Sequence, residues 1–280
     1  MGAHHAHLFL YGDIMRTKKI QPAPVIAAIL VLSLACNIGA AEPTLEPGQD
    51  SNPPPPSAGD STTGGLCDNA LFPVKQGATW TYFNTGSPSG DFSYTDTITE
   101  VRADGFTLTS QFADLIRTQE WQCEAGGLKA LEMGGAGAAA SISTQGTTAE
   151  FTTTGITGIS LPKEITPGMQ WQYSLTMQGV TAMPGDQNAQ STGAFSLTMQ
   201  EMGKETVSVP AGAFEAVKFQ ATSLMQITAN FQGLQVPVTM NGTSIVWYAP
   251  GVGYIKSIEN SDFGGAPYTS TTELQSYSIP

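Results

Sequence analysis

The sequence predicts a mainly β fold built as an antiparallel meander, and three observations support this prediction. Short apolar runs alternate with polar residues at a period of two, as half-buried strands do. Turn-forming residues separate these runs, and no long stretch has the 3.6-residue apolar spacing of an amphipathic helix. The alternation is clearest at Phe92, Tyr94 and Ile98; at Phe106, Leu108 and Phe112; at Trp171, Tyr173, Leu175 and Met177; and at Phe195, Leu197 and Met199.

Residues 1–36 have the features of an export signal. Three basic side chains lie between Arg16 and Lys19, and Val25–Ala35 is an apolar run of 11 residues. This run matches a secretory signal and is shorter than the roughly 20 apolar residues that cross a bilayer. Met15 directly precedes the basic residues, so we interpret it as the true start of the protein.

Cys36 follows small residues and resembles the lipid-modified cysteine of bacterial lipoproteins. The sequence departs from the usual pattern at Ser33, where an aliphatic residue is preferred. The alternative is ordinary cleavage after Ala41, which would release a secreted protein. Both interpretations predict export. Lipidation would anchor the protein in the cell envelope, at the outer face of the cytoplasmic membrane, in the periplasm or at the cell surface.

The number of cysteines favours lipidation, because the chain has three of them, Cys36, Cys67 and Cys123. If Cys36 carries lipid, the other two can form a disulfide in an oxidising compartment. Closing this loop would stabilise the fold by about 4 kcal/mol on the chain-entropy model. The alternative is two buried free thiols.

The composition divides the remaining chain into a linker and a domain. Residues 37–66 have no basic residue, almost no large apolar residue and four consecutive prolines at Pro53–Pro56. Such a segment cannot bury enough apolar surface to offset its ordering entropy, so we expect a disordered tether. Residues 67–280 are expected to form a single β domain.

Turn signals are strongest in the second half of this domain. Asn241-Gly242 is a pair typical of two-residue hairpins, and we expect a turn there between two strands. Pro210 and Gly212 are expected to lie in a second turn, and Gly251 and Gly253 in a third.

The pattern Gly-x-x-Trp-x-Tyr occurs twice, 91 residues apart, each time shortly after a proline. Both copies would place Trp and Tyr on one face of a strand that begins after a turn. Either the sheet has two similar halves, or Pro–Gly–aromatic is simply a common way to begin a strand. Aromatic residues in such positions favour core filling over a ligand cage. The two copies are Gly77, Trp80 and Tyr82, and Gly168, Trp171 and Tyr173.

The net charge and the histidine content narrow the range of possible functions. The formal net charge is −12, and a surface this acidic repels nucleic acids. The only histidines are His4, His5 and His7, ahead of the export signal. The mature chain therefore lacks the imidazole that a Ser-His-Asp mechanism or a typical zinc site requires. We expect a protein that is not an enzyme and that has no cofactor and no metal.

Carboxylates are the remaining candidates for chemistry, because a pair of them can hydrolyse a glycosidic bond. Most of the candidates are expected at turns or at solvent-facing strand positions. For calcium, Asp104-Gly105 and Asp262-Phe263-Gly264 resemble turns, and neither is an Asp-x-Asp-x-Asp-Gly loop. The candidate carboxylates are Asp91, Asp96, Glu100, Asp104, Asp114, Glu120 and Glu124.

Three blocks of sequence carry a resemblance to a known family: Phe72–Tyr82, Val207–Ala216 and Trp247–Lys256. They are similar to a group of poorly characterised bacterial lipoproteins, the TapB-like family. The resemblance implies a curved sheet or half-barrel like that of periplasmic lipoprotein carriers. It implies no catalytic residues.

These observations leave three hypotheses for function. The first is a non-enzymatic, lipid-anchored envelope lipoprotein whose β domain has a binding or structural role towards an unknown protein. The second is a carrier that holds a lipid or another hydrophobic ligand on the concave face of the sheet. The third is a carboxylate-dependent hydrolase. An apolar cavity of several hundred cubic ångströms would favour the carrier, whereas an interior filled by aromatic side chains would contradict it.

Overall fold

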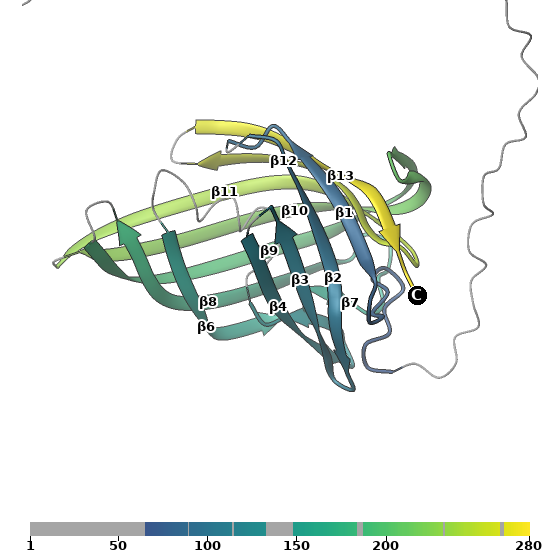
Figure 1. Cartoon of the computed structure of the whole chain (residues 1–280), viewed down its shortest axis with the longest axis horizontal. Coiled ribbons are helices and arrows are strands. Elements are labelled where there is room, and N and C mark those ends of the chain that lie inside the picture. The colour runs from purple at the N-terminus through teal and green to yellow at the C-terminus, as the bar shows by residue number, and fades with distance from the viewer. Residues whose placement is uncertain are drawn as a thin grey trace, which may run out of the picture. The chain divides into compact units, whose positions relative to one another are not determined.

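The computed structural model describes residues 65–88, 90–113, 115–132, 148–183, 187–231, 233–263 and 266–280. All of these lie in the compact unit Pro56–Pro280. The predicted export signal, Cys36 and nearly all of the predicted linker lie outside the described residues. Where the chain is described, its regular secondary structure consists of β-strands alone (Figure 1), which confirms the mainly β prediction. No helix with the length and apolar character of a membrane span occurs in these ranges.

Thirteen strands form one antiparallel sheet. They are β1 (Thr79–Thr85), β2 (Phe92–Arg102), β3 (Gly105–Phe112), β4 (Leu115–Glu124), β5 (Gly127–Ala130), β6 (Thr148–Gly158), β7 (Leu161–Pro162), β8 (Gln170–Met183), β9 (Gln187–Val209), β10 (Gly212–Phe231), β11 (Leu234–Ala249), β12 (Gly253–Phe263) and β13 (Ala266–Ser278).

The order of strands in the sheet departs from a simple meander at three neighbouring pairs, β6–β8, β13–β1 and β5–β7. The order is β6-β8-β9-β10-β11-β12-β13-β1-β2-β3-β4-β5-β7. The first and last strands, β1 and β13, are therefore neighbours inside the sheet, and β6 and β7 form its two edges. Elsewhere consecutive strands pair with each other, as a meander requires.

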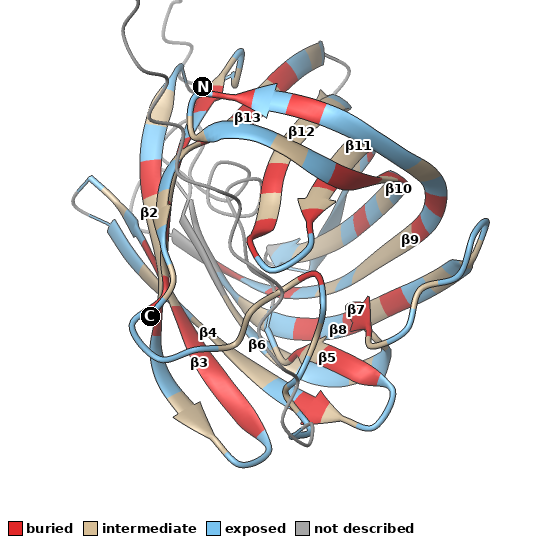
Figure 2. Cartoon of the chain, turned by 90° about the vertical axis from the view of Figure 1, so that its right-hand side faces the viewer, coloured by how far each residue is buried: buried red, intermediate tan, exposed pale blue. Residues whose placement is uncertain are grey.

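The sheet curves strongly, so that its two edges approach each other (Figure 2). Only Ile159 and Ser160 separate the end of β6 from the start of β7 at the opposite edge. Side chains from β8 cross the remaining distance: Tyr173 Oη donates to the Ala130 carbonyl (2.8 Å) and Trp171 Nε1 to the Ser160 carbonyl (3.2 Å). The sheet is an open half-barrel whose edges are joined by side chains instead of a backbone ladder, in agreement with the predicted curvature.

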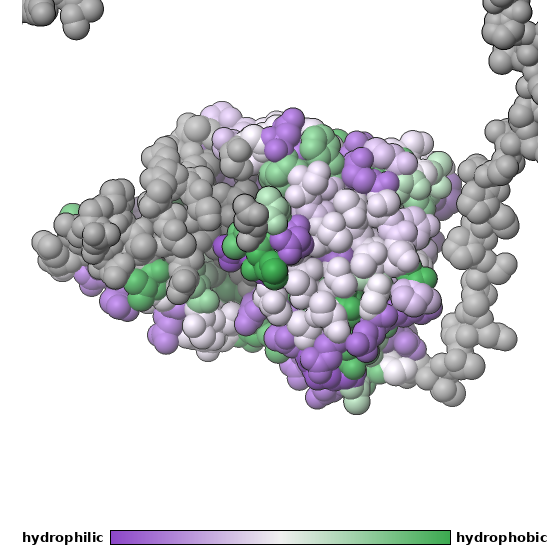
Figure 3. All heavy atoms as spheres, in the orientation of Figure 1, coloured by the Kyte–Doolittle hydropathy of each residue, from purple (hydrophilic) through white to green (hydrophobic). Residues whose placement is uncertain are grey.

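The interior of the half-barrel follows the predicted alternation. Tyr94, Ile98, Phe106 and Leu108 point to the concave side and are at most 7% exposed. The visible outer surface is mostly hydrophilic or neutral, with apolar residues in scattered spots (Figure 3). Burial of one face of each strand is the main driving force for the curvature, because a flat sheet of this composition would leave that face in water.

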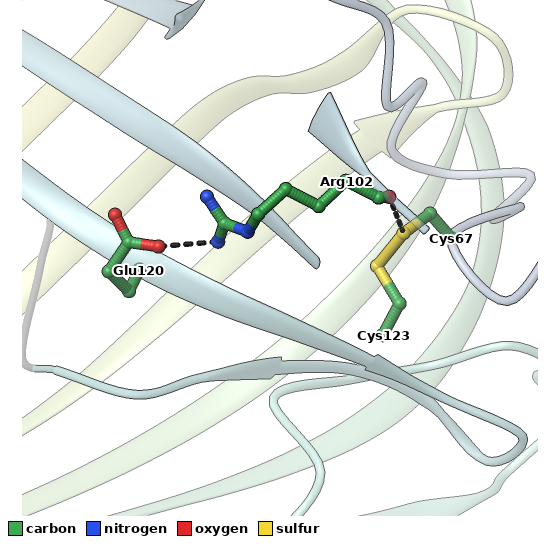
Figure 4. Close-up of a disulfide and its surroundings, with 4 residues drawn as sticks. All are labelled: Cys67, Arg102, Glu120 and Cys123. Atoms are coloured by element: carbon green, nitrogen blue, oxygen red, sulfur yellow. Dashed lines mark hydrogen bonds and ion pairs between the residues drawn. A yellow bond between two sulfur atoms is a disulfide. The ribbon is translucent and has the colours of Figure 1, made fainter. Parts of the chain in front are cut away.

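One end of the half-barrel is closed by the segment that precedes β1, residues 65–78, which we call the plug. Phe72 of the plug stacks on Trp80 (ring centroids 5.4 Å apart) and on Phe106 (5.8 Å). The Cys67–Cys123 disulfide fastens the plug to β4, next to the Arg102–Glu120 ion pair (Figure 4). The predicted disulfide is confirmed.

The predicted hairpin turn at Asn241-Gly242 is wrong. β11 runs through both residues without interruption, and Gly242 pairs with Ser223 on one side and Ser261 on the other. A Cβ atom at Gly242 would lie 2.3 Å from Ser261 Oγ, so any side chain there would have to displace the Ser261 hydroxyl. The chain turns instead between β10 and β11, where Gly233 has a φ of +85°. The other two predicted turns are confirmed, after Val209 and after Ala249.

The two Gly-x-x-Trp-x-Tyr copies have the same local geometry. Each glycine has a positive φ, +83° at Gly77 and +74° at Gly168. Each begins a strand, β1 or β8, and each tryptophan and tyrosine donates a hydrogen bond to a distant backbone carbonyl. A common start for two strands is therefore observed, while duplication of two whole halves stays a prediction.

Candidate functional site

The concave side of the sheet holds a cavity of about 460 Å³. Alternate residues of a strand point to opposite faces, so each strand contributes every second side chain to this space. The volume falls within the range of roughly 300–1,000 Å³ that is typical of small-molecule sites. The cavity is lined by two kinds of surface, one aromatic and one polar.

The aromatic wall comes from the plug and from β1, β2 and β4. Tyr82 and Tyr94 stack with their centroids 5.0 Å apart. The polar atoms of two rings of this wall are paired within the protein: Trp80 Nε1 donates to the Val252 carbonyl (2.6 Å) and Tyr82 Oη to the Tyr254 carbonyl (3.0 Å). Burial raises the pKa values of Tyr82 and Tyr94 well above the usual range, so both stay neutral. The wall consists of Phe72, Trp80, Tyr82, Phe92, Tyr94 and Trp121.

The hydroxyl wall lies on β10–β13 and carries small polar side chains. Its centre is Glu259 on β12, which pairs in register with Ser244 and Ser270 on the two flanking strands. Ser261 Oγ donates to Glu259 Oε1 (2.5 Å). Burial and the nearby Glu259 carboxylate raise the pKa of Tyr268. The wall consists of Ser223, Ser244, Ser257, Ser261, Ser270 and Thr272.

Asn84, at the end of β1, lies where the two walls meet. Its side chain is 5% exposed and lines the cavity. Asn84 Nδ2 donates to Thr272 Oγ1 (2.8 Å). Asn84 Oδ1 is buried and accepts no hydrogen bond from the described residues. An unpaired buried acceptor is rare in folded proteins and requires an explanation.

Asp96 on β2 is the carboxylate on the aromatic side of the cavity. It pairs in register with Trp80 on β1 and with Ser110 on β3. Ser110 Oγ donates to Asp96 Oδ1 (2.5 Å), the one side-chain hydrogen bond of this carboxylate among the described residues. Burial raises the pKa of Asp96 to about 6, an effect that the Ser110 hydroxyl partly opposes. Desolvation is the largest cause, and among the described residues no cation contributes to lowering this pKa.

The structure places the predicted motif residues in different roles. Trp80, Tyr82 and Tyr173 line the cavity. Trp171 packs edge-on against Phe219 next to it, whereas Trp247 donates from Nε1 to Glu205 Oε1 (2.6 Å). The glycines and proline of the motifs occupy turns and strand starts: Gly77, Gly168, Pro210, Gly212, Gly251 and Gly253. Lipidation of Cys36 concerns a residue outside the described ranges and stays a prediction.

The candidate carboxylates do not gather at one place. Of those that the structure describes, only Asp96 lines the cavity. Glu100 and Glu120 form ion pairs with Arg102, and Glu124 forms one with Lys129. Asp91 Oδ1 accepts from the Gly86 amide, and Asp104 is exposed in a turn. Asp114 lies outside the described residues. Groups of three or more His, Cys, Asp or Glu that could hold a metal ion are absent from the described residues.

Sequence reasoning missed Glu259, Asp262 and Asn84 as lining residues of the cavity. The signal for Asp96 was available, because it shares strand parity with Tyr94 and Ile98, both of which point inward. No such signal marks Glu259, because the residues that alternate with it are mainly serines.

These features define the class of the molecule: an all-β protein with one curved antiparallel sheet and a cavity on the concave side. A DUF3108-like family model matches residues 115–274, more than half of the chain, so the chain belongs to this family. No curated protein matches the sequence.

Three solved structures resemble the chain in part. A protein from Bacteroides fragilis, named as exported and as having a YmcC-like fold, is 15% identical with a TM-score of 0.46, covering 76% of this chain and 100% of its own. A protein from Parabacteroides distasonis, named as a lipoprotein, is 15% identical with a TM-score of 0.48, covering 76% and 99%. The hypothetical lipoprotein YmcC from Escherichia coli is 11% identical with a TM-score of 0.30, covering 72% and 85%.

Proposed function

We propose that this protein is an exported, lipid-anchored and non-enzymatic lipoprotein that holds a hydrophobic or amphiphilic small molecule inside its half-barrel. The observation that carries the proposal is the cavity of about 460 Å³ on the concave face. Of the hypotheses derived from the sequence, the carrier gains most from it.

A cavity of this size needs a physical reason. Protein interiors are packed as densely as organic crystals, and empty space forfeits contacts between the side chains around it. Ile98, Phe106 and Phe219 are completely buried elsewhere in the same core, so this chain is able to fill its interior. The cavity is instead lined by Ser223, Ser244 and Ser257, whose small side chains leave room for a ligand.

The anchor and the location rest on the sequence. The export signal, Cys36 and the proline-rich tether together describe a domain held at a distance from a membrane. The Cys67–Cys123 disulfide supports a location outside the cytoplasm, where such bonds persist. Membership of the TapB-like group is a finer prediction than the DUF3108-like family and is part of this proposal.

Binding of a nonpolar probe tests the proposal. The processed chain is purified from membranes into a nonionic amphipathic polymer and titrated with pyrene, which has no polar group. Trp80 and Trp121 line the cavity, so energy transfer from tryptophan to pyrene reports a probe inside it. We expect saturable transfer that Ser223→Phe abolishes by filling the cavity. Gln220→Phe, on the exposed face of the same strand, should leave it intact.

Two results would contradict the proposal. Non-saturable transfer that is equal in both variants would show that pyrene partitions without a site. Mass spectrometry of the same preparation addresses the anchor: acylated Cys36 at the new N-terminus is expected, whereas a free N-terminus at Glu42 would show secretion after cleavage behind Ala41.

A further inference from the structure

We propose that the ligand is an uncharged or cationic amphiphile with a hydroxyl or amine headgroup, held at Asn84 and the hydroxyl wall, and that the site discriminates against anionic amphiphiles. This inference rests on the proposed function and names the chemical class of the ligand. Three independent features of the cavity carry it.

The first feature is the unpaired acceptor of Asn84. Its side chain is 5% exposed, it lines the cavity, and its Nδ2 is already committed to Thr272. Asn84 Oδ1 has no partner within the described residues, so a hydrogen-bond donor inside the cavity would satisfy it. A ligand hydroxyl provides that donor. If the amide oxygen and nitrogen of Asn84 exchanged places, the same hydroxyl could accept a hydrogen bond from the amide nitrogen instead.

The second feature is the sign of the charge. The lining includes the carboxylates of Asp96, Glu259 and Asp262, and it contains no lysine, arginine or histidine. The segments of residues 65–280 that the structure leaves undescribed contain no basic residue either. An anionic headgroup would meet like charge in a medium of low dielectric, whereas an ammonium group would meet opposite charge.

Arg117 on β4 is a basic residue that lies near the Asp96–Ser110 pair in the sheet. It pairs in register with Ser110, the partner of Asp96. It does not line the cavity and forms no ion pair with a described carboxylate. Its Nε is buried without a partner within the described ranges, so it is included in the test below.

The third feature is the separation of the walls. Asn84, Thr272 and Ser257 lie side by side on β1, β13 and β12, and Glu259 is two residues further along β12. The aromatic wall lies on β1, β2 and β4, with Trp80 and Phe72 at the end that the plug closes. Met240, Tyr248 and Tyr254 also line the side formed by β11 and β12, so that side is not wholly polar. The hydrogen-bonding side chains still gather at Asn84, Thr272 and Glu259, and we place the head of an amphiphile there and its apolar chain on the aromatic rings.

Displacement of pyrene by three amphiphiles with the same twelve-carbon chain tests the inference. The probes are 1-monolauroylglycerol, dodecylamine and laurate, and the readout is loss of the tryptophan-to-pyrene transfer. We expect the neutral and cationic probes to displace pyrene at concentrations at least about tenfold lower than laurate. Laurate acting at the same or lower concentration would overturn the inference.

Two variants locate the headgroup. Asn84→Leu should raise the concentration of 1-monolauroylglycerol that is required by about tenfold, the worth of one hydrogen bond, when that concentration is scaled to the affinity of the same variant for pyrene. Asn260→Leu, an exposed asparagine on β12, serves as the matched control and should change nothing. Glu259→Gln should weaken dodecylamine by about tenfold and 1-monolauroylglycerol by clearly less, because glutamine keeps a hydrogen-bonding side chain and removes the charge.

The outcomes separate this inference from the proposed function. Failure of pyrene to bind would refute the cavity as a site. Pyrene binding with equal displacement by all three probes would refute only the headgroup assignment. Laurate displacement that Arg117→Gln removes would assign the site to an anionic ligand and would overturn the inference. If Asn84→Leu does not fold, Glu259→Gln and the probe ranking still decide between these results.

Discussion

Replacing Asp96 by asparagine should stabilise the protein at neutral pH and leave it unchanged in acid. Asp96 is held among aromatic rings, and burial raises its pKa to about 6. The folded state therefore binds the proton more tightly than the unfolded chain, in which the pKa is about 3.9. Below about pH 4 the carboxyl is protonated in both states, and its full contribution to stability is present. This contribution is lost as the pH rises to about 6, because the unfolded state loses its proton first.

The size of the effect follows from the two pKa values. A difference of about two pH units corresponds to about 3 kcal/mol of unfolding free energy. Solvent that reaches Asp96 through the cavity reduces this value, and we expect Asp96→Asn to be more stable than the wild type by about 1–3 kcal/mol at pH 7.5. Asparagine can still accept the hydrogen bond from Ser110 Oγ, so the substitution removes the buried charge with little other change.

Urea unfolding of both proteins at about pH 4, pH 5, pH 6 and pH 7.5 measures this difference. Asp104→Asn is the control, because it removes one negative charge from an exposed turn. An Asp96→Asn gain that persists at about pH 4 would show that ionisation of Asp96 is not its cause. A gain of the same size for Asp104→Asn at pH 7.5 would show that overall charge and not burial is responsible.

Three further predictions concern how the sheet is held together. Replacing both Cys67 and Cys123 by alanine should lower the unfolding free energy by about 4 kcal/mol on the chain-entropy model, and a non-reducing urea titration that shows no loss would contradict it. Gly158→Ala should lower the unfolding free energy by about 2–4 kcal/mol, because a Cβ atom there would lie 2.0 Å from a backbone oxygen of β8 and the φ is +79°. Gly90→Ala, with a positive φ but open space around it, should lower it by about 1–2 kcal/mol. Equal losses of stability for the two variants on thermal unfolding would refute the steric argument. Tyr173→Phe removes the hydrogen bond by which β8 reaches β5 at the opposite end of the sheet and should cost about 1–2 kcal/mol, with faster amide exchange in β5 as the specific readout.

The local features of the fold were predictable because they depend on neighbouring residues. Alternation at Tyr94 and Ile98 identifies a strand with one buried face, and the Pro210–Gly212 turn follows from the backbone preferences of its residues. The Cys67–Cys123 pairing could be predicted by counting cysteines. The Asn241-Gly242 prediction failed because a glycine that relieves crowding inside a sheet looks the same, one residue at a time, as a glycine that makes a turn.

The order of strands and the composition of the site could not be predicted in the same way. β1 pairs with β13, so Trp80 lies opposite Tyr277 on the adjacent strand although nearly the whole sequence of the domain separates them. No local sequence pattern predicts such a contact. Serines on the hydroxyl wall have the same polar character as serines on an outer face, so Glu259 could not be assigned to the interior. Asn84 becomes noticeable only when the positions of its neighbours show that one of its atoms has no partner.

The pairing of β1 with β13 also affects when the protein can fold. Strand β1 has β2 on one side, but its other side stays unpaired until residues Ala266–Ser278 arrive. A chain made from its N-terminus therefore has this central seam open until β13 is available, although the consecutive strands between them can already pair with one another. Closure of the seam is a late step in assembly, and it joins the first and last strands of the domain.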